Sequence, residues 1–168
     1  MKIIVRPATR SDLPAILGIY NEAVLHTTAS YDYDPSTLEA RTAWFEAHEA
    51  NQLPVFVADE DGKVCGWSAL NAFRPWIGYR FTVENSVYVA ADRRGQGIGK
   101  LLLPPLIEAA RQRGMRVILA GIDAENQSSI RLHAAFGFER VAYFKQVGYK
   151  FDRWLDLVFM ELLLADGQ

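Results

Sequence analysis

The sequence predicts an α+β domain in which helices pack against a mixed sheet. In the N-terminal half, apolar residues at helical spacing are followed by apolar runs joined through an Asp-Gly turn, which predict helices and then antiparallel strands. In the C-terminal half the predicted order is strand, loop, helix, strand, helix and further strands. This succession is typical of α+β architecture. The 168 residues contain no repeat, low-complexity tract or linker, so we expect one continuous domain over 1–168.

The N-terminal third predicts one strand and two helices. We expect the strand over residues 3–8, and helices over 13–27 and 38–51 with a loop over 30–36 between them. Thr9 and Asp12 precede the first helix in a Thr-x-x-Asp capping pattern. The apolar residues of this helix that recur at helical spacing are Leu13, Ile16, Leu17, Tyr20 and Val24.

The remaining elements follow from turn signals. Strands are expected over 54–59 and 64–73, joined by a hairpin at Asp61-Gly62, and over 82–90. A helix should end at Arg113 with Gly114 as its stop, followed by a strand over 116–123. A helix over 126–137 ending at Gly137 and a closing strand over 154–164 complete the prediction.

Pro104 and Pro105 fall inside the helix that ends at Arg113. Each proline removes a backbone donor, and a proline in a helix interior costs about 3 kcal/mol. We therefore expect a kink at this point, or a helix that begins later than the apolar pattern suggests.

Composition and charge narrow the class of protein. A formal net charge of -2 gives no reason to expect nucleic acid or an anionic membrane as partner. The single cysteine, Cys65, excludes an internal disulfide, and we expect it to be buried rather than nucleophilic. His26 and His48 lack metal-ligand spacing, so we expect no metal. Without a signal peptide or an apolar run near the roughly 18 residues of a membrane span, a cytoplasmic location is expected.

The segment "RRGQGIG" at 93–99 has the composition of a loop that holds phosphate. A triphosphate-binding loop requires Gly at position 94 and Ser or Thr at position 101, where this chain has Arg and Leu. A dinucleotide fingerprint requires a third glycine where Lys100 stands, although Asp123 ends the next strand at a suitable distance for a ribose. Too little chain follows to build the second half of a doubly wound sheet.

The run from Arg94 to Gly99 resembles the Arg/Gln-x-x-Gly-x-Gly pyrophosphate loop of the GCN5-related N-acetyltransferases. The residues that extend the resemblance are Asn126, Leu132, His133, Gly137 and Phe138. "YNEAV", "TVENSVYV", "RLHAAFGF" and "QVGYKFDRWLDLVFM" are most similar to the phosphinothricin and methionine sulfoximine branch. This resemblance covers nearly the whole chain and implies a mixed, mostly antiparallel twisted sheet flanked by helices, with acetyl-CoA as co-substrate.

The resemblance also implies which residues bind acetyl-CoA. Glycine-rich loop amides at a helix N-terminus form an anion site, and nearby cations add to it. The backbone of Val87 and Val89 is expected to pair with the pantetheine arm, and Val89 also to polarise the thioester carbonyl. The residues expected at this co-substrate are Val87, Tyr88, Val89, Arg94, Gly95, Gln96, Gly97, Ile98, Gly99, Lys100, Asn126 and Ser129.

Two residues are candidates for catalysis. Period-two alternation places Glu84 on one face of its strand with Thr82, Ser86 and Tyr88. Glu84 resembles the general base of the family, acting through water, with an exposed structural carboxylate as the alternative. His133 resembles the residue near the coenzyme sulfur, where a protonated imidazole would hydrogen-bond the leaving thiolate, and a packed helix histidine is its alternative.

The acceptor is expected to be a small amino acid or analogue. Arginine forks suit a carboxylate, and aromatic residues beside them suit a pocket wall. The residues expected to bind the acceptor are Tyr31, Phe73, Arg74, Arg80 and Thr82. "SYDYD" and "AFRPW" differ from the "IWN" and "DWRPF" patterns of the sulfoximine branch, so the exact substrate stays open. A protein or peptide N-acetyltransferase and an inactive coenzyme-A sensor are the alternatives.

The C-terminal run is rich in aromatic residues and resembles a dimer interface of the family. It predicts a homodimer with Lys150, Arg153 and Trp154 close to the interface or the acceptor site.

Overall fold

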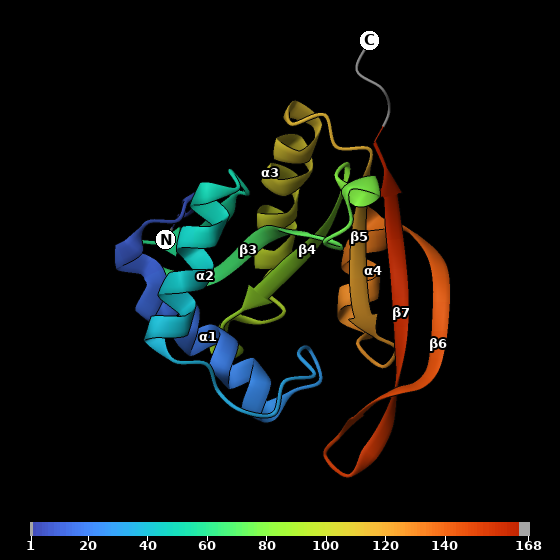
Figure 1. Cartoon of the computed structure of the whole chain (residues 1–168). Coiled ribbons are helices and arrows are strands. Elements are labelled where there is room, and N and C mark those ends of the chain that lie inside the picture. The colour runs from blue at the N-terminus through green and yellow to red at the C-terminus, as the bar shows by residue number, and fades with distance from the viewer. Residues whose placement is uncertain (1, 165–168) are drawn as a thin grey trace.

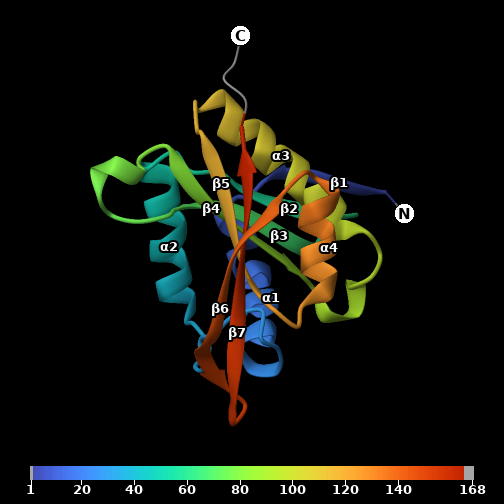
Figure 2. The same ribbon diagram turned by 90° about the vertical axis from the view of Figure 1, so that its right-hand side faces the viewer.

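The computed structural model describes residues 2–164 as a seven-stranded sheet with two layers of helices (Figures 1 and 2). The strands are β1 (Ile3–Pro7), β2 (Val55–Glu60), β3 (Lys63–Ala72), β4 (Thr82–Val89), β5 (Val117–Asp123), β6 (Glu139–Lys150) and β7 (Arg153–Leu163). The α-helices are α1 (Leu13–His26), α2 (Leu38–Ala50), α3 (Ile98–Gln112) and α4 (Gln127–Ala135). Within these residues, no helix is both long and apolar enough to cross a membrane.

The sheet consists of two wings that meet at β4 and β5. The strand order is β1-β2-β3-β4-β5-β7-β6, and every neighbouring pair is antiparallel except β4 and β5. These two parallel strands pair only where Thr82–Glu84 face Val117–Leu119. Figure 1 shows β4 turning away from β5 beyond this point. The sheet is therefore split over the C-terminal parts of both strands.

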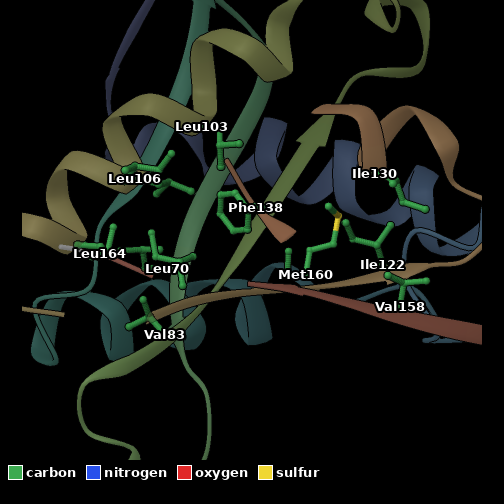
Figure 3. Close-up of a cluster of buried hydrophobic side chains, with 14 residues drawn as sticks. Leu70, Val83, Leu103, Leu106, Ile122, Ile130, Phe138, Val158, Met160 and Leu164 are labelled. Atoms are coloured by element: carbon green, nitrogen blue, oxygen red, sulfur yellow. The ribbon is translucent and has the colours of Figure 1, made fainter. Parts of the chain in front are cut away.

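Each face of the sheet has its own hydrophobic core. On one face Leu13 and Ile16 of α1 and Phe45 of α2 pack on β2 and β3. On the other face the side chains of α3 and α4 pack against β4, β5 and β7, and Figure 3 shows Leu103, Leu106, Ile130 and Phe138 in this cluster. Val83 and Val87 belong to the second cluster and Tyr88 to the first, which confirms the predicted alternation along β4.

The predicted turns are confirmed. The β2–β3 hairpin closes with Glu60 opposite Lys63, and Asp61 (φ 52) and Gly62 (φ 87) both have positive φ, as a type I′ turn requires. Gly114 follows α3 with φ 68 and Gly137 follows α4 with φ 87, so both glycine stops are confirmed. The Thr-x-x-Asp box forms on the 3₁₀ turn before α1, where the amide of Thr9 donates to Asp12 Oδ2 at 2.8 Å.

Two predictions about the elements need correction. The helix containing Pro104 and Pro105 is α3, which begins at Ile98 and continues through both prolines, so a later start is wrong. Pro104 is exposed, as are Lys100 and Leu101 one turn earlier, so the carbonyls that lose their helical donors face solvent. The second correction is β6, which sequence patterns did not identify because its residues are mostly exposed and do not alternate.

Candidate active site

A cavity of about 880 Å³ lies between the end of β4, the N-terminus of α3 and α4. All the residues predicted to bind acetyl-CoA line it except Gln96. The side chain of Gln96 folds back on its own turn, where Oε1 accepts from Arg93 Nε at 3.1 Å and Nε2 donates to the carbonyl of Asp92 at 3.3 Å. Arg93, one of the cations expected to add charge for the phosphates, also lines the cavity. The lining residues that the sequence did not predict are Ala23, Thr27, Thr28, Ala29, Glu125, Ser128, Arg131, Leu132 and Ala135.

The loop glycines have two different physical roles. Gly95 (φ 75) and Gly97 (φ 81) adopt left-handed backbone, and a Cβ on either would meet no atom within 4 Å. Their bare backbone therefore faces the open cavity at the N-terminus of α3, where amides and the helix dipole favour an anion. Gly99 differs because its Cβ would lie 2.9 Å from Leu132 Cδ2, so glycine lets α3 pack closely against the Leu132 side chain of α4.

Cations stand around this loop, and two of them already have carboxylate partners. Arg93 Nη1 lies 2.5 Å from Glu60 Oε2, and Arg94 forms an ion pair with Glu22. Arg94 also donates through Nε to the carbonyl of Val89 at 3.3 Å. The ion pairs hold both guanidinium groups at the cavity before any phosphate arrives.

The split in the sheet frees backbone groups at the end of β4. The amide of Ala90 donates to Cys65 of β3 at 3.0 Å. Because backbone groups alternate along a strand, those of Val87 and Val89 point the other way, to the side that β5 has left. An extended ligand at this edge can pair with Val87 and Val89 as an added strand does. Cys65 itself is 1 % exposed, which confirms its predicted burial.

A second cavity of about 210 Å³ continues from the first into the split. The two cavities share Ala29, Val87, Tyr88, Asn126 and Ser129. The smaller one is also lined by Glu84 and His133, so both predicted catalytic residues face the same space from different elements. Five other polar or small residues in its wall were not predicted as site residues: Asn85, Ser86, Ala120, Gly121 and Asp123.

Glu84 lies where β4 and β5 separate. Gly121 of β5 lies beside its carboxylate. A Cβ on Gly121 would lie 3.1 Å from Glu84 Oε1, so glycine leaves room for this carboxylate. Burial raises the pKa of Glu84, while the nearby Arg74 cation and the Gly121 amide act in the opposite direction. A carboxylate with a raised pKa is a better proton acceptor.

His133 is 3 % exposed, and both of its ring nitrogens have partners. Nδ1 lies 2.8 Å from the carbonyl of Ser129 and therefore carries the proton, so Nε2 accepts from Asn85 Nδ2 at 2.9 Å. Burial lowers the pKa of His133. The geometry thus favours a neutral imidazole and does not favour the protonated form expected from the sequence. Asn126 caps α4, accepting from the amide of Ser129 at 3.1 Å, while it also lines both cavities.

The predicted acceptor residues separate into two groups. Arg74 acts electrostatically on Glu84, and the ring of Phe73 contacts Phe159, whose ring lies beside Gly121. Arg80 has different partners: its guanidinium lies over Phe81 and donates to the carbonyl of Ile77 at 3.2 Å within its own loop.

Thr82 pairs with Val117 where the sheet is still closed. None of the five residues predicted to bind the acceptor lines either of the two cavities. Tyr31 approaches the site through its hydroxyl, which donates to Asp123 Oδ2 at 2.8 Å. Asp123 had been noted only as a possible ribose contact, and Gly121 gave no sequence signal because its role depends on Glu84 of another strand.

The comparisons with known proteins agree with this geometry. Residues 5–159 match the family described as "Acetyltransferase (GNAT) domain". The chain is 48 % identical over 165 residues to an L-methionine sulfoximine/L-methionine sulfone acetyltransferase of Pseudomonas paraeruginosa, covering 98 % of this chain and 96 % of the relative. No group of three or more His, Cys, Asp or Glu side chains that could hold a metal occurs in the described part of the chain.

Two solved structures are similar over nearly the whole chain. A phosphinothricin acetyltransferase from Sinorhizobium meliloti in complex with AcCoA is 40 % identical, with a TM-score of 0.95, 99 % of this chain and 91 % of that chain covered. A ribosomal-protein-alanine N-acetyltransferase from Brucella melitensis is 48 % identical, with a TM-score of 0.94, 96 % of this chain and 99 % of that chain covered. The chain therefore belongs to the GCN5-related N-acetyltransferase (GNAT) family, whose enzymes use acetyl-CoA, and is an N-acetyltransferase.

Proposed function

We propose that this enzyme acetylates the α-amine of a small L-amino acid or analogue of the methionine sulfoximine, methionine sulfone or phosphinothricin type. The observation that carries the proposal is the pair of joined cavities. A space large enough for a coenzyme continues into one of about 210 Å³, and Glu84 lies in the wall of the smaller space. The names of the relatives in Pseudomonas and Sinorhizobium support the class of acceptor.

Acetyl-CoA fits the residues of the larger cavity. The bare backbone at Gly95 and Gly97 leaves open space for a pyrophosphate beside the N-terminus of α3. Val87 offers its backbone amide and carbonyl to the pantetheine amides and Val89 offers its amide, since the carbonyl of Val89 already accepts from Arg94. Asn126 and Ser129 line both cavities. When bound, acetyl-CoA supplies the activated acetyl group as a thioester.

In the proposed mechanism Glu84 takes a proton from the α-amine, directly or through water. An α-ammonium cannot act as a nucleophile until it loses a proton, and a carboxylate of raised pKa facing the cavity is suited to accept it. The absence of a side chain at Gly121 leaves room for the carboxylate at the split. We assign the neutral His133 to the wall of this space, where it fixes the amide of Asn85.

Arg74 is the residue best placed to bind the acceptor carboxylate, because it is the cation that acts on Glu84. An amino acid has its carboxylate and α-amine one carbon apart, so a cation and a base close together suit this substrate. The acidic or neutral end of the side chain would lie toward the aromatic residues Phe73 and Phe159.

A protein N-terminus is the alternative acceptor, favoured by the name of the Brucella melitensis relative. A peptide needs an open groove for its following residues, whereas the smaller cavity here is compact. The test is thiol release from acetyl-CoA with free amino acids, methionine sulfoximine, methionine sulfone and phosphinothricin, each compared with Ala-initiated peptides. Faster turnover of the peptides would overturn the proposed acceptor class, and turnover of neither would favour a coenzyme-A-binding sensor.

We also propose that the enzyme works as a homodimer in the cytoplasm. The β6–β7 hairpin exposes a set of large apolar side chains: Val141, Tyr143, Phe144, Val147, Tyr149, Phe151 and Trp154. Exposed apolar surface of this kind supports an interface between two copies. Light scattering at micromolar concentration should give twice the mass of one chain, and a monomer would contradict the homodimer. A single buried thiol supports a reducing compartment.

A further inference from the structure

The loop that follows α1 closes one side of both cavities. We refer to residues 27–33 as the strap. Thr27, Thr28 and Ala29 line the larger cavity, and Ala29 lines the smaller one as well. On the side of the N-terminal wing, the hydroxyl of Tyr88 on β4 donates to the carbonyl of Ala29 at 3.4 Å. The shape of both substrate spaces therefore depends on where the strap is held.

The strap reaches across the split to the C-terminal wing. Figures 1 and 2 show the chain after α1 running toward the end of the β6–β7 hairpin. The hydroxyl of Tyr31 donates to Asp123 Oδ2 at 2.8 Å and to the carbonyl of Asp156 at 3.2 Å. The hydroxyl of Tyr33 donates to the carbonyl of Tyr149.

Gly148 of β6 leaves room for the ring of Tyr31. A Cβ on Gly148 would lie 2.5 Å from Cε2 and 2.8 Å from Cδ2 of the Tyr31 ring. Contacts this short are impossible, so the ring can rest on the hairpin only because residue 148 is glycine. The strap thus packs on the β6–β7 hairpin through the ring of Tyr31.

Lys150, two residues further along β6, binds the strap with its charged end. Its side chain is buried, with the residue 3 % exposed. Nζ donates to the carbonyls of Val24 at 2.6 Å, Thr27 at 2.9 Å and Ser30 at 2.7 Å. Each of the three N–H groups of the ammonium therefore has a carbonyl acceptor. A cation at the carbonyl end of α1 is also favoured by the helix dipole.

We propose that Lys150 is a positioning residue for catalysis, which fixes the strap and through it the walls of the two substrate cavities. This inference deepens the proposed function and rests on it for the identity of the acceptor. Lys150 touches neither cavity, because its Nζ is enclosed by the strap and the end of α1. Its loss should therefore weaken the binding of both substrates more than it slows the chemical step.

The test is Lys150→Met, with Lys145→Met as the matched control. Both lysines are on β6, but Lys145 is exposed. Hydrogen bonds to a charged group are strong enough that their loss should raise KM for acetyl-CoA and for the acceptor about 10- to 100-fold. We expect kcat to fall less than either KM rises, and Lys145→Met to match the wild type.

Two readouts do not depend on the acceptor. Calorimetry should show weaker acetyl-CoA binding by Lys150→Met, and chymotrypsin should cleave faster after Tyr31 and Tyr33 because the strap is released. These results would support Lys150 even if no amino acid were acetylated, in which case only the proposed function would fail. Wild-type acetyl-CoA affinity and wild-type cleavage in folded Lys150→Met would overturn the inference, as would a loss of kcat with both KM values unchanged.

Gly148→Ala keeps the inference testable if Lys150→Met does not fold. Its new methyl group displaces the ring of Tyr31 from residue 148 and should reproduce the rise in both KM values and the faster cleavage. Gly18→Ala is its control, because a Cβ there meets no atom within 4 Å. A folded Gly148→Ala protein with an unchanged strap and unchanged KM values would contradict the role of the hairpin.

Discussion

The two wings of the sheet are held together by different means. In the N-terminal wing β1 to β4 pair along their lengths, and helices on both faces bury the side chains between them. The C-terminal wing extends beyond the sheet as the β6–β7 hairpin, whose outer strand is mostly exposed. Between the wings β4 and β5 share three residue pairs. The cavities of the candidate active site therefore lie where regular pairing stops, and the strap joins the wings again beyond them.

Glu84→Gln, a change at the split between the wings, should give the largest loss of activity. Glutamine keeps the size of the side chain and one carbonyl oxygen, but cannot accept a proton from the amine. A general base contributes about 100- to 10,000-fold, so kcat should fall by this factor while acetyl-CoA affinity stays constant. The deficit should shrink as pH rises, because more of the amine is then already deprotonated. Near wild-type turnover at neutral pH would exclude the role as base.

We expect substitutions in the two wings to change the free energy of unfolding by different amounts. Ile16 on α1 is 0 % exposed in the N-terminal core, whereas Val147 on β6 is 56 % exposed. Ile16→Ala should lower the free energy of unfolding by about 2–5 kcal/mol through lost burial and a cavity. Val147→Ala should change it by less than about 0.5 kcal/mol in the monomer. Urea unfolding monitored by circular dichroism measures both, and similar losses would contradict the comparison.

Gly97→Ala tests the phosphate loop at the edge of the N-terminal wing. Its methyl group enters the open cavity and strains a left-handed residue by about 1–2 kcal/mol, so KM for acetyl-CoA should rise about tenfold. Gly62→Ala in the β2–β3 turn is the matched control, since it also has positive φ and open space. Gly62→Ala should lose stability without a change in KM. Equal KM values for both variants would show that the loop does not bind the phosphates.

The sequence predicted the N-terminal wing better than the split between the wings. Turns at Asp61-Gly62 and helix stops at Gly114 and Gly137 depend on local backbone, which residue type reveals. The spacing of Glu84 and of the loop glycines is also local, and these residues do line the two cavities. Residues 74 and 80 are both arginines of one loop, so the sequence cannot distinguish them, and only their surroundings in the fold do.

The residues missed have roles that depend on partners far along the chain. Gly121 was missed because its role is to leave room for Glu84, which lies 37 positions earlier in the sequence and on the opposite side of the split. Lys150 was predicted close to the dimer interface or the acceptor site, but its contact with the strap was missed, because β6 folds back onto the end of α1 and brings Lys150 to carbonyls more than a hundred residues earlier. His133 was found by position, but its charge state follows from burial, which a helical pattern alone did not determine.

Arg74→Ala should raise KM for the acceptor if Arg74 binds its carboxylate, but its effect on the pH profile should be the smallest of the predicted changes and is the sharpest test of which loop arginine acts on Glu84. Glu84 must be ionised to act, so activity is lost on the acid side as pH falls through its pKa. Burial already raises this pKa above the ordinary 4.5, and Arg74 lowers it in part. Removing Arg74 should therefore raise the pKa further and move the acid limb of kcat/KM to higher pH. Because Arg74 is exposed, the shift should be less than about one pH unit.

Arg80→Ala is the control for this shift, because the Arg80 guanidinium lies over Phe81 within its own loop. We expect its acid limb to coincide with that of the wild type. Added salt should move the wild-type limb in the same direction as Arg74→Ala, since it screens the same interaction, and should move the limb of Arg74→Ala less. A limb that stays in place in Arg74→Ala, or moves to lower pH, would show that Arg74 does not act on the catalytic carboxylate. Arg74 would then lose its claim to the acceptor carboxylate as well, because both roles depend on the same closeness to Glu84.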